Sequence, residues 1–448
     1  MNKKWHDFLK KLNGKSVAIL GAGVSNRPLI PIFADAGAKV TVCDKNIELN
    51  RDEVSCGREI TFQLGNDYLE YLNQDYIFRS PGLRFDLPQL KQAVEKGSIL
   101  TSEMELFLQF CPAKTIGITG SDGKTTTSTL IHLFLKEEGI CCHLGGNIGT
   151  PLLTKLDEIK ETDVVVLELS SFQLHTMKDS PDISVITNLS PNHLDVHKSY
   201  EEYIEAKTNI FLHQNKHGVL VLNEDNDDTA KLGIYAKGDV RFFSRKRKAD
   251  VYEKDGLIYV QGQVIMNTSD IVIPGGHNIE NYMTAIAATL DLVKKESVIR
   301  VANTFGGVEH RIEFVRKVKG ISYYNSSIDS SPNRSRATLN VFPEKVIMIA
   351  GGKDKGIPYD DLGPVIDEHV KQLILIGATA DKIEEAVKKI GSKVTICRCQ
   401  TYEEAVTLSF ESGEEGDVVV LSPASTSFDM FRNFEERGNL FKKLVNEL

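Results

Sequence analysis

The sequence of 448 residues lacks the long apolar run that a membrane-spanning helix requires, because no stretch reaches about 18 residues without a charge. Its first residues, Met1 to Lys11, also lack the apolar core of a secretory signal peptide, since Lys, Trp and Asp are interspersed there. We therefore expect a cytoplasmic protein with no membrane span. With 41% hydrophobic residues, the composition is that of a globular protein and excludes a disordered or fibrous chain.

The sequence also lacks cysteine pairs at metal-binding spacing and an excess of positive charge. None of its seven cysteines forms a C-x-x-C motif, because Cys141 and Cys142 are adjacent and Cys397 and Cys399 are one residue apart. We expect free thiols. The 53 Lys and Arg residues against 62 Asp and Glu residues give a net charge of −9, which argues against a dedicated nucleic-acid binder. One basic run, residues 245–248, is interpreted as a solvated loop.

What the sequence does contain is a series of short β-branched runs, nearly all of which end in Gly, Ser, Asn or Asp. Continuous apolar strands between helical stretches are typical of α/β folds with parallel sheets covered on both faces. The length fits two to four domains of roughly 100–200 residues each. We divide the chain into three α/β blocks, 1–103, 104–308 and 309–448. Within the middle block, residues 251–266 alternate apolar and polar side chains around Asp255-Gly256, which predicts an antiparallel hairpin.

The strongest local signal is a glycine-rich loop in the middle block, Thr119-Gly120-Ser121-Asp122-Gly123-Lys124-Thr125-Thr126. It lies between an apolar strand and a helical stretch, so backbone amides and a helix N-terminus would face an anion there. Lys124 would add a point charge, and Thr125 would offer a hydroxyl to Mg²⁺. The strict phosphate-loop pattern is not met, because Ile118 stands where the first glycine belongs. The context still favours nucleotide binding over a plain turn.

A weaker glycine-rich turn opens the first block. Gly21 and Gly23 are followed by an acidic residue, Asp44, at the end of the next apolar run. Asn26 replaces the third glycine of the dinucleotide-binding fingerprint. This pattern alone leaves nucleotide binding and a plain tight turn equally open.

Acidic and histidine side chains follow two strands of the middle block. Glu168 lies inside the apolar run DVVVLELSS, close to the expected phosphate loop, where a carboxylate can hold Mg²⁺. A paired core carboxylate is the alternative. His193 and Asp195 come just after another strand. A lone histidine on a loop is more often structural or exposed than a ligand, so these residues leave its role open.

Lys207 occupies an unusual position on an expected helix, residues 201–214. It lies at three- and four-residue spacings from Tyr203, Ile204, Ile210 and Phe211, which form an apolar stripe. Lysine rarely occupies such a stripe. Either its stem snorkels along the apolar surface, or its amine is desolvated and has a lowered pKa that makes it reactive.

Together these residues resemble the Mur ligase family, and the resemblance runs through all three blocks in order. Its most specific element is Glu168-Leu169-Ser170-Ser171-Phe172-Gln173-Leu174, which marks the family member that adds D-glutamate. The supporting matches are GITGSDGKTTT from Gly117, GGNIGTP from Gly145, NHLDVH from Asn192, GGHNIEN from Gly275, FGGVEHR from Phe305, GGKDKG from Gly351 and LSPASTSFDMFRNF from Leu421.

The resemblance implies a Rossmann-like UDP-binding domain, a central P-loop ATPase-like domain with a mostly parallel sheet, and a C-terminal Rossmann-like domain for the incoming amino acid. It implies that ATP phosphorylates the carboxylate of UDP-N-acetylmuramoyl-L-alanine, and that D-glutamate attacks the acyl phosphate, in peptidoglycan precursor synthesis. Another Mur-type amino-acid ligase and a folylpolyglutamate synthase-like ligase are the alternatives. We expect small-molecule substrates, no nucleic-acid partner and a monomer.

The family's site residues carry over to matching positions of this sequence. The implied catalytic residues are Lys124, His193, Lys207 and Arg311. The implied ATP-binding residues are Gly120, Ser121, Asp122, Gly123, Lys124, Thr125, Thr126, Asn278, Asn281 and Arg311. The implied UDP-substrate residues are Gly21, Ser25, Asp44, Ser80, Gly82, Asn147 and Ser170. The implied D-glutamate residues are Ser330, Lys355, Ser427 and Phe434. The implied Mg²⁺ ligands are Thr125, Glu168, His193 and Lys207, the last as a carbamate derived from CO₂.

The sequence departs from the family at residues 325–331. Many relatives read N-D-S-K-A-T-N there, whereas this chain reads N-S-S-I-D-S-S and so loses an Asp and a Lys while gaining Asp329. The ADP-ribose and phosphate contacts implied for that segment are therefore unassigned. Arg334 or Arg336 is the hypothetical replacement for the missing cation, since both follow the same loop.

Two other classes of protein explain less of the sequence. An NAD-dependent dehydrogenase accounts only for the first glycine-rich turn and Asp44, and a nucleic-acid-binding ATPase only for the phosphate loop and the basic run. The ligase reading accounts for the loop, Glu168, Lys207 and the third block.

Overall fold

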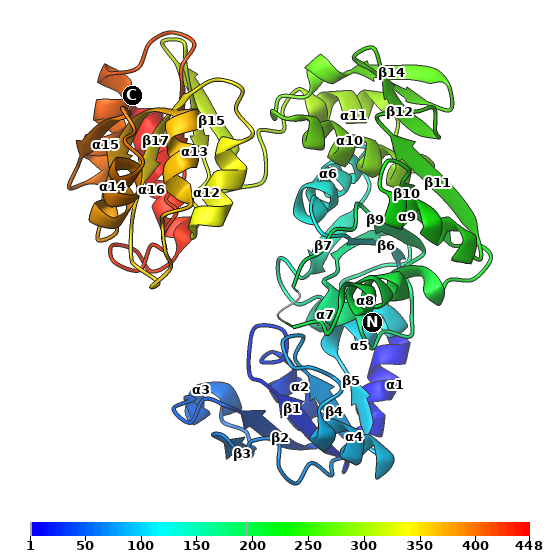
Figure 1. The fold of residues 1–448 in the computed structure, drawn as a ribbon. Helices are drawn as coiled ribbons and strands as arrows, with labels where there is room; N and C mark the ends of the chain where they lie inside the picture. Colours follow the sequence, from blue (N-terminus) through cyan, green and yellow to red (C-terminus); the bar gives the residue numbers. More distant parts are fainter. Residues whose placement is uncertain (1, 194–195) are drawn as a thin grey trace. The chain divides into compact units, whose positions relative to one another are not determined.

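The computed structural model describes residues 2–193 and 196–448 and contains three β-sheets, of five, nine and six strands (Figure 1). Helices separate most of the strands, which confirms the α/β class and the three successive sheets expected from the sequence. Asp195, one of the loop residues singled out above, lies outside the described residues.

The first sheet is entirely parallel, with the strand order β3-β2-β1-β4-β5. This order is Rossmann-like, as the family resemblance implies for the first domain, and its topological switch point lies between β1 and β4, at the carboxyl ends of these two strands. The strands are β1 Ser16–Leu20, β2 Lys39–Asp44, β3 Thr61–Leu64, β4 Tyr76–Arg79 and β5 Ile99–Thr101. The helices of this part are α1 Lys3–Lys11, α2 Leu29–Asp35, α3 Arg51–Ser55, α4 Pro88–Glu95 and α5 Glu103–Phe110.

The middle sheet has the order β14-β13-β12-β11-β10-β9-β6-β8-β7 and is parallel from β12 to β7. The strands are β6 Lys114–Thr119, β7 Cys142–Gly146, β8 Val164–Glu168, β9 Ile183–Ile186, β10 Val219–Asn223, β11 Asp239–Ser244, β12 Val251–Lys254, β13 Leu257–Val260 and β14 Gln263–Asn267. β8 and β9 are completely buried, as continuous apolar strands under two helical layers should be.

The expected hairpin is confirmed at one edge of this sheet. β12 and β13 pair antiparallel, and the turn between them places Asp255 and Gly256 at φ 52° and 75°. Two consecutive positive φ angles belong to the type I′ turn that an Asp-Gly pair favours. The nearby basic run, residues 245–248, is partly neutralised, since Arg245 bonds Glu253 at 3.1 Å. This supports its interpretation as a surface loop.

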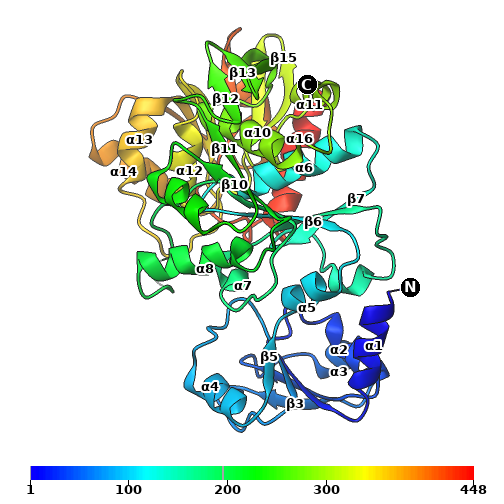
Figure 2. The ribbon, with the colours of Figure 1, turned by 90° about the vertical axis from the view of Figure 1, so that its right-hand side faces the viewer.

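The helices of the middle part place the residues that matter most for function. They are α6 Lys124–Glu137, α7 Ser171–Leu174, α8 Tyr200–Leu212, α9 Asp227–Ala230, α10 Gly276–Thr289 and α11 Lys295–Ala302, with 3-10 turns at Leu153–Lys155, Lys231–Tyr235 and Thr268–Asp270. α6 packs on β6, β7 and β8, and α7 packs beside α8 (Figure 2). The phosphate loop therefore lies between β6 and α6, as expected.

The third sheet has the order β15-β16-β20-β17-β18-β19, in which only β15 runs antiparallel to its neighbour. Its strands are β15 Glu313–Val318, β16 Ile321–Asn325, β17 Val346–Ala350, β18 Val370–Leu375, β19 Thr395–Arg398 and β20 Val418–Leu421. Its helices are α12 Pro332–Leu339, α13 Leu362–His369, α14 Ala380–Lys389, α15 Tyr402–Glu411 and α16 Phe434–Glu447.

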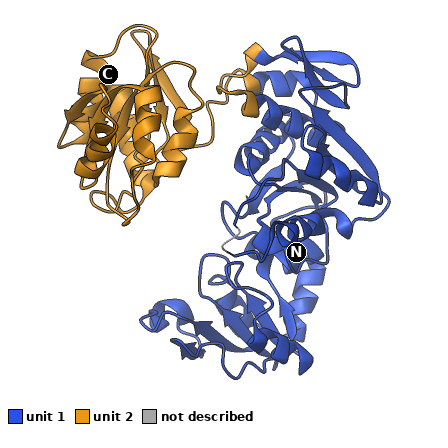
Figure 3. Cartoon of the chain, in the orientation of Figure 1, with its two compact units in different colours: residues 1–268, 279–301 blue, residues 269–278, 302–448 orange. Residues whose placement is uncertain are grey.

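The chain separates into two compact units (Figure 3). Unit 1 comprises Met1–Thr268 with Ile279–Val301 and holds the first and middle sheets, whereas unit 2 comprises Ser269–Asn278 with Ala302–Leu448 and holds the third. Among the described residues, no helix combines the length and the apolar character needed to cross a bilayer.

Candidate functional site

The phosphate loop can adopt its conformation only because two of its residues are glycines. Gly120 has φ 147°, and a Cβ added there would lie 1.9 Å from Thr187 Oγ1. Gly123 has φ 78°, and its added Cβ would lie 2.4 Å from Asn281 Oδ1. Gly123 is also the residue before the first turn of α6. The backbone is therefore free to approach an anion at the N-terminus of this helix.

Hydrogen bonds to the loop after β9 hold the phosphate loop in place. The Ser121 hydroxyl bonds the Ser190 carbonyl at 3.0 Å and accepts from the Ser190 amide at 2.9 Å. The Asp122 amide donates to Asn188 Oδ1 at 3.0 Å. Lys124 Nζ donates to the carbonyls of Gly120 and Ser121, both at 2.9 Å. The amine that we expect to contact the outer phosphates of a nucleotide therefore lies across the loop.

Glu168 lies beside this loop at the carboxyl end of β8. Its register partner on β6 is Ile118, two residues before Gly120. The side chain is 2% exposed. Oε1 accepts a hydrogen bond from Asn147 Nδ2 at 2.9 Å, whereas Oε2 has no hydrogen-bond partner. A buried carboxylate oxygen without a partner is costly, and a bound cation would satisfy it, so the donor set here fits Mg²⁺.

Lys207 reaches the same loop from α8. Its side chain is 2% exposed, and Nζ donates to Thr119 Oγ1 at 3.1 Å and to the Gly120 carbonyl at 2.8 Å. Nζ also lies 4.7 Å from the centre of the Tyr203 ring. A snorkelling lysine would place its amine in water, so this geometry excludes that alternative and supports the desolvated amine.

The electrostatic surroundings favour the neutral form of Lys207. Burial lowers the pKa of Lys207 well below its usual 10.5, and the positive charge of Lys124 lowers it further, while Glu168 and Asp122 act in the opposite direction. A neutral amine keeps a lone pair and can act as a nucleophile. The phosphate loop, Glu168 and Lys207 thus form one continuous polar site at the carboxyl ends of β6 and β8.

His193 lies on the exposed loop after β9, with a positive φ of 54°. Its ring contacts Phe172 edge-to-face at a centroid distance of 5.3 Å. The structure therefore brings His193 to the segment that follows Glu168, although its role as a metal ligand stays a prediction.

The residues predicted for the UDP moiety meet at the switch point of the first sheet. A Cβ on Gly21 would lie 3.1 Å from Ser80 Oγ, and Asp44 Oδ2 accepts from the Ala22 amide at 2.8 Å, so Asp44 holds the glycine-rich turn. Ser25 lines a small pocket together with Asn26, Arg79 at the end of β4, Pro81 and Gln173 of α7. Gly82 follows in the same loop, and a Cβ added there would have no atom within 4 Å.

Ser170 has a local structural role in addition to the predicted one. It is the N-cap of α7 and forms a capping box with Gln173, whose Oε1 accepts from the Ser170 amide at 3.0 Å and from its hydroxyl at 2.9 Å. This box fixes the turn that immediately follows Glu168, and Asn147 fixes the Glu168 side chain itself.

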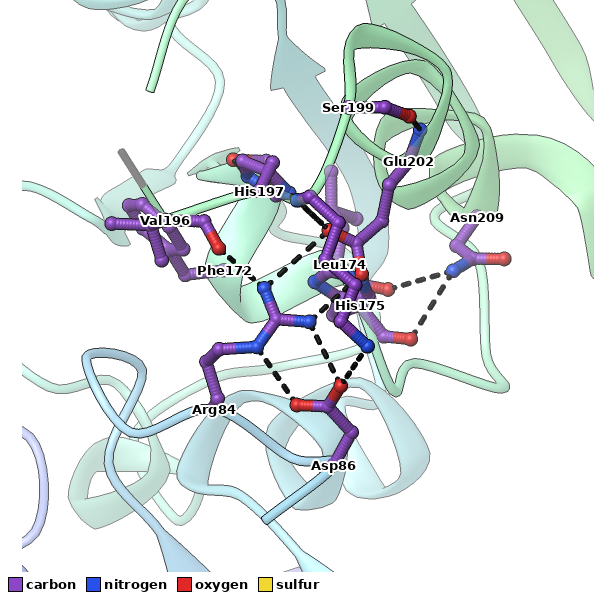
Figure 4. Close-up of polar contacts among 12 residues, drawn as sticks. Arg84, Asp86, Phe172, Leu174, His175, Val196, His197, Ser199, Glu202 and Asn209 are labelled. Carbon is purple, nitrogen blue, oxygen red and sulfur yellow. Dashed lines mark hydrogen bonds and ion pairs between the residues drawn. The ribbon is translucent and has the colours of Figure 1, made fainter. Parts of the chain in front are cut away.

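Two arginines that the sequence analysis did not single out connect the first sheet to this region. Arg79, 2% exposed, donates to the Phe172 carbonyl at 3.0 Å and to the Leu83 carbonyl at 2.7 Å. Arg84 donates to Asp86 at 2.8 Å, to Glu202 at 2.8 Å and to the Val196 carbonyl (Figure 4). A cluster of rings, Phe85, His175, His197 and Phe172, extends beside Arg84.

The arginine contacts change the titration of their partners. Hydrogen bonds from Arg84 and Lys198 hold the pKa of Asp86 far below its usual range. Hydrogen bonding to Arg84 lowers the pKa of Glu202 to about 2, although partial burial opposes this shift. Burial lowers the pKa of His175 to about 4, so this imidazole is neutral at physiological pH.

In unit 2, three loops meet at the carboxyl ends of β16, β20 and β17. Arg437, fully buried on α16, connects two of them through bonds to the Ser327 carbonyl at 2.7 Å and to the Ser425 carbonyl at 3.1 Å. The third loop joins them where the Lys353 amide donates to the Thr426 carbonyl at 2.8 Å. This brings the segments of all four predicted D-glutamate residues to one edge of the sheet: Ser330, Lys355, Ser427 and Phe434.

The sequence itself contains a signal for the buried position of Arg437. Arg437 shares an apolar stripe with Phe434, Phe441 and Val445 on α16, at the same three- and four-residue spacings that identify Lys207.

The structure does not bring all the other predicted ATP residues to the phosphate loop. Asn281 lies against Gly123, whereas the Asn278 side chain donates to the Pro274 carbonyl and Arg311 lies in unit 2.

The segment 325–331, where the sequence departs from the family, lies in the core of unit 2. Asp329 is 4% exposed and accepts from the Ser422 hydroxyl at 2.8 Å, and burial raises the pKa of its carboxyl. Of the two candidate cations, Arg334 donates back to the Ile328 carbonyl at 3.3 Å, whereas Arg336 donates to the Asp361 carbonyl at 3.1 Å. Arg334 therefore stays at the loop, and Arg336 extends to α13.

Comparison with known proteins places most of these features in one family. The model of the Mur ligase middle domain matches residues 118–289, and that of the Mur ligase glutamate ligase domain matches residues 310–425. Curated relatives are similar over their whole length. UDP-N-acetylmuramoylalanine–D-glutamate ligases of Ruminiclostridium cellulolyticum and Acetivibrio thermocellus are each 53% identical, over 468 and 464 positions, with 100% of both chains covered. The ligase of that name from Clostridium botulinum is 48% identical, with 100% and 99% covered.

Solved structures share the fold at low sequence identity. The UDP-N-acetylmuramate-alanine ligase MurC from Thermotoga maritima has a TM-score of 0.57 and 18% identity, with 97% of this chain and 99% of that chain covered. The MurF ligase from the same organism, in complex with ADP, has a TM-score of 0.58 and 18% identity, with 98% and 97% covered. At such identities the likeness establishes the fold alone.

Proposed function

The chain belongs to the Mur ligase family, and on that premise we propose that it is an ATP-dependent ligase that joins D-glutamate to UDP-N-acetylmuramoyl-L-alanine in peptidoglycan synthesis. The observation that carries this assignment is 53% identity over full length to two relatives named for that reaction. The geometry supports it, because the phosphate loop, the partnerless oxygen of Glu168 and buried Lys207 meet at one place.

The reaction we propose has two steps. The carboxylate of the L-alanine residue attacks the γ-phosphate of ATP, which gives an acyl phosphate and ADP. The amine of D-glutamate then attacks the acyl carbon, and phosphate leaves. The phosphate-loop amides, the α6 N-terminus and Lys124 supply positive charge to the transferring phosphoryl group. We propose that Gly120, Ser121, Asp122, Gly123, Lys124, Thr125 and Thr126 bind the ATP phosphates, with Asn278, Asn281 and Arg311 as the remaining ATP contacts.

Mg²⁺ would be held by Thr125, Glu168, His193 and Lys207, and when bound it would neutralise charge on the phosphates. The support for Glu168 is its buried Oε2 without a partner. The support for a carbamate on Lys207 is its lowered pKa, because only a neutral amine adds to CO₂. Addition of CO₂ releases a proton and converts the amine into an anionic oxygen ligand, which would stand beside Lys124 and Thr119.

The remaining substrate residues are assigned by position. Gly21, Ser25, Asp44, Ser80 and Gly82 would contact the UDP moiety, and Asn147 and Ser170 the muramoyl group. Ser330, Lys355, Ser427 and Phe434 would bind D-glutamate, and Arg437 would hold their loops together. We further propose three domains, 1–103, 104–308 and 309–448, in a cytoplasmic monomer. The proposed substrates, ATP and a UDP-linked sugar, support the cytoplasmic location.

Arg334 is the better candidate for the cation that the segment 325–331 lacks, because it stays at this loop. If Arg334 contacts the nucleotide, Arg334→Ala should weaken ATP binding while Arg336→Ala should not. Equal ATP affinity and turnover in both variants and the wild type would exclude both residues.

The experiment that tests the function is phosphate release from ATP in the presence of UDP-N-acetylmuramoyl-L-alanine and one amino acid at a time. D-Glutamate should give the highest rate. A preference for L-alanine or a diamino acid would favour another Mur-type ligase, and activity with folate and glutamate would favour a folylpolyglutamate synthase-like enzyme. NAD binding, or stimulation of ATP hydrolysis by duplex DNA, would support the dehydrogenase or the nucleic-acid ATPase instead.

A further inference from the structure

Three side chains with different donor atoms meet at the amino ends of β7 and β8, away from the candidate nucleotide site. Cys141 Sγ, a His143 ring nitrogen and an Asp163 carboxylate oxygen all lie within 4.8 Å of one another. His143 Nε2 lies 3.0 Å from Asp163 Oδ2. None of the three is used in the reaction proposed above.

The backbone explains why these residues meet. The Val164 amide bonds the Cys141 carbonyl at 3.0 Å, so the ladder between β7 and β8 extends to Cys141. Side chains two residues apart on a strand share a face, which places Cys141 and His143 together. His143 is the register partner of Val165 on β8, and Asp163, two residues before Val165, has the same face.

The carboxylate is already oriented toward this site. Asp163 is 4% exposed, and its Oδ2 accepts a hydrogen bond from the Lys160 amide at 3.0 Å. Hydrogen bonds that orient a carboxylate in this way are typical of the groups that surround metal ligands.

The neighbouring sulfur and imidazole provide a contrast on the opposite face of β7. Cys142 Sγ lies 3.2 Å from His132 Nδ1, and Cys142 is only partly exposed. Cys142 therefore points away from the cluster of Cys141, His143 and Asp163 and is not part of it. Cys141, by contrast, is exposed and belongs to the cluster with His143 and Asp163.

We propose that Cys141, His143 and Asp163 form a binding site for a borderline divalent transition metal, of which Zn²⁺ is the representative. Thiolate, imidazole and carboxylate are all ligands of Zn²⁺, and water would complete a tetrahedron. Bond lengths of about 2.0–2.3 Å place tetrahedral ligands roughly 3.3–3.7 Å apart, so the three donors need only small side-chain movements to bind one ion. Binding releases the thiol proton of Cys141 to solvent.

The position of this site predicts its effect. Parallel sheets bind substrates at the carboxyl ends of their strands, and these residues lie at the opposite ends. β7 is an edge strand and leads directly to Asn147, which holds Glu168. A metal that joins β7 to β8 would therefore secure the edge of the sheet, and it would increase thermal stability without taking part in phosphoryl transfer.

Co²⁺ titration of the full-length, metal-free protein tests the proposal, because a cobalt–thiolate bond gives a charge-transfer absorption in the near ultraviolet. The wild type should show this absorption at one equivalent of Co²⁺, and added Zn²⁺ should abolish it. Cys141→Ser and His143→Ala should lose it, whereas the control Cys142→Ser should keep it. The Mg²⁺ site has no sulfur ligand, so binding there cannot give this signal.

A second measurement uses stability instead of absorption. Zn²⁺ should raise the thermal unfolding midpoint of the wild type and of Cys142→Ser, and this rise should disappear in Asp163→Asn, which keeps the shape of the side chain. Circular dichroism of each variant in chelator verifies that it is folded. No charge-transfer absorption in the wild type, its persistence in Cys141→Ser, or its loss in Cys142→Ser would each overturn the proposal.

Discussion

Arg84 and Glu202 join the loop after β4 to the helix that carries Lys207. The guanidinium of Arg84 donates to Glu202 Oε1 at 2.8 Å, and the two side chains are 23% and 18% exposed. The same guanidinium bonds the Val196 carbonyl, in the loop that carries His193. One arginine of the predicted UDP-binding loop therefore bonds both the helix that carries Lys207 and the loop that carries His193 (Figure 4).

Replacement of Arg84 should impair substrate binding more than it impairs folding. Arg84→Ala frees the predicted UDP-binding loop from α8, so we expect a higher KM for the UDP substrate and a smaller decrease in kcat, with Arg84→Lys intermediate. In a double-mutant cycle with Glu202→Gln, the coupling free energy should be about 1–2 kcal/mol. A coupling near zero, or equal changes of KM for ATP and the UDP substrate, would contradict a positioning role.

The same pair should make stability depend on pH in the acid range. The pKa of Glu202 is lowered to about 2 in the folded protein from an ordinary 4.5. The stabilisation is therefore complete above the ordinary value and is lost as pH falls toward the folded one. The difference in unfolding free energy between wild type and Glu202→Gln should be constant above pH ~5 and shrink between pH ~4.5 and ~2. Urea unfolding from pH 6 to 3 measures it, and a difference independent of pH would be inconsistent with this pair.

The features that were predictable from sequence are those whose signal is local. The phosphate loop was recognised because its glycines, strand and helix are contiguous, and Lys207 because its apolar neighbours lie one helical turn away. The alternation of strands and helices gave the α/β class and all three sheets. The Asp255-Gly256 hairpin is another local pattern, in which two residues determine the turn.

The features that could not be predicted depend on contacts between distant segments. Arg84 and Glu202 are 118 residues apart, and nothing in either local sequence specifies the other. Asn147 follows β7 and Glu168 ends the neighbouring strand β8, 21 residues later, so their bond depends on sheet order, which strand patterns alone do not determine. Arg437 is a different case, since its helical stripe was visible in the sequence and only its partners were not.

Lys207 should be essential for turnover and unfavourable for stability. A lysine whose pKa is lowered in the folded state binds its proton more strongly when unfolded, so stability is lost as pH falls below the ordinary value of 10.5. Lys207→Met keeps the volume without the amine. In CO₂-free buffer we expect this variant to unfold at a higher temperature than the wild type.

The same variant should nearly abolish phosphate release. If a carbamate is a metal ligand, kcat should fall by about 10²-fold or more, because charge stabilisation by a metal is worth several kcal/mol. Wild-type activity should also rise with dissolved CO₂, and Lys207→Met should not respond. Full activity of the variant would remove Lys207 from the site.

Replacement of Gly120 should be harmful for two reasons, the steric clash of an added Cβ and the strain of a positive φ. Gly120→Ala places a Cβ 1.9 Å from Thr187 Oγ1 at φ 147°, whereas Gly139 has φ 85° with no atom within 4 Å of its added Cβ. Gly139→Ala should therefore cost only the backbone strain, about 1–2 kcal/mol of unfolding free energy, and keep ATP affinity. Gly120→Ala should lose more stability and lose ATP binding, as measured by calorimetry. Similar ATP affinities for the two variants would show that the loop has room for a side chain.

Glu168→Gln removes the charge of this carboxylate but keeps its hydrogen bond with Asn147, so it tests the charge alone. The glutamine keeps an oxygen that can accept from Asn147 Nδ2, so we expect the variant to fold and to unfold at a similar urea concentration. It replaces the buried Oε2, which has no partner, with an uncharged group. If Glu168 holds Mg²⁺, the Mg²⁺ concentration for half-maximal turnover should rise by at least about tenfold, since even indirect partners of a metal contribute that much affinity. Asn147→Ala should produce a smaller shift in the same direction, because it frees the carboxylate without removing its charge. An unchanged Mg²⁺ dependence in Glu168→Gln would instead make this residue a core carboxylate held by Asn147 alone.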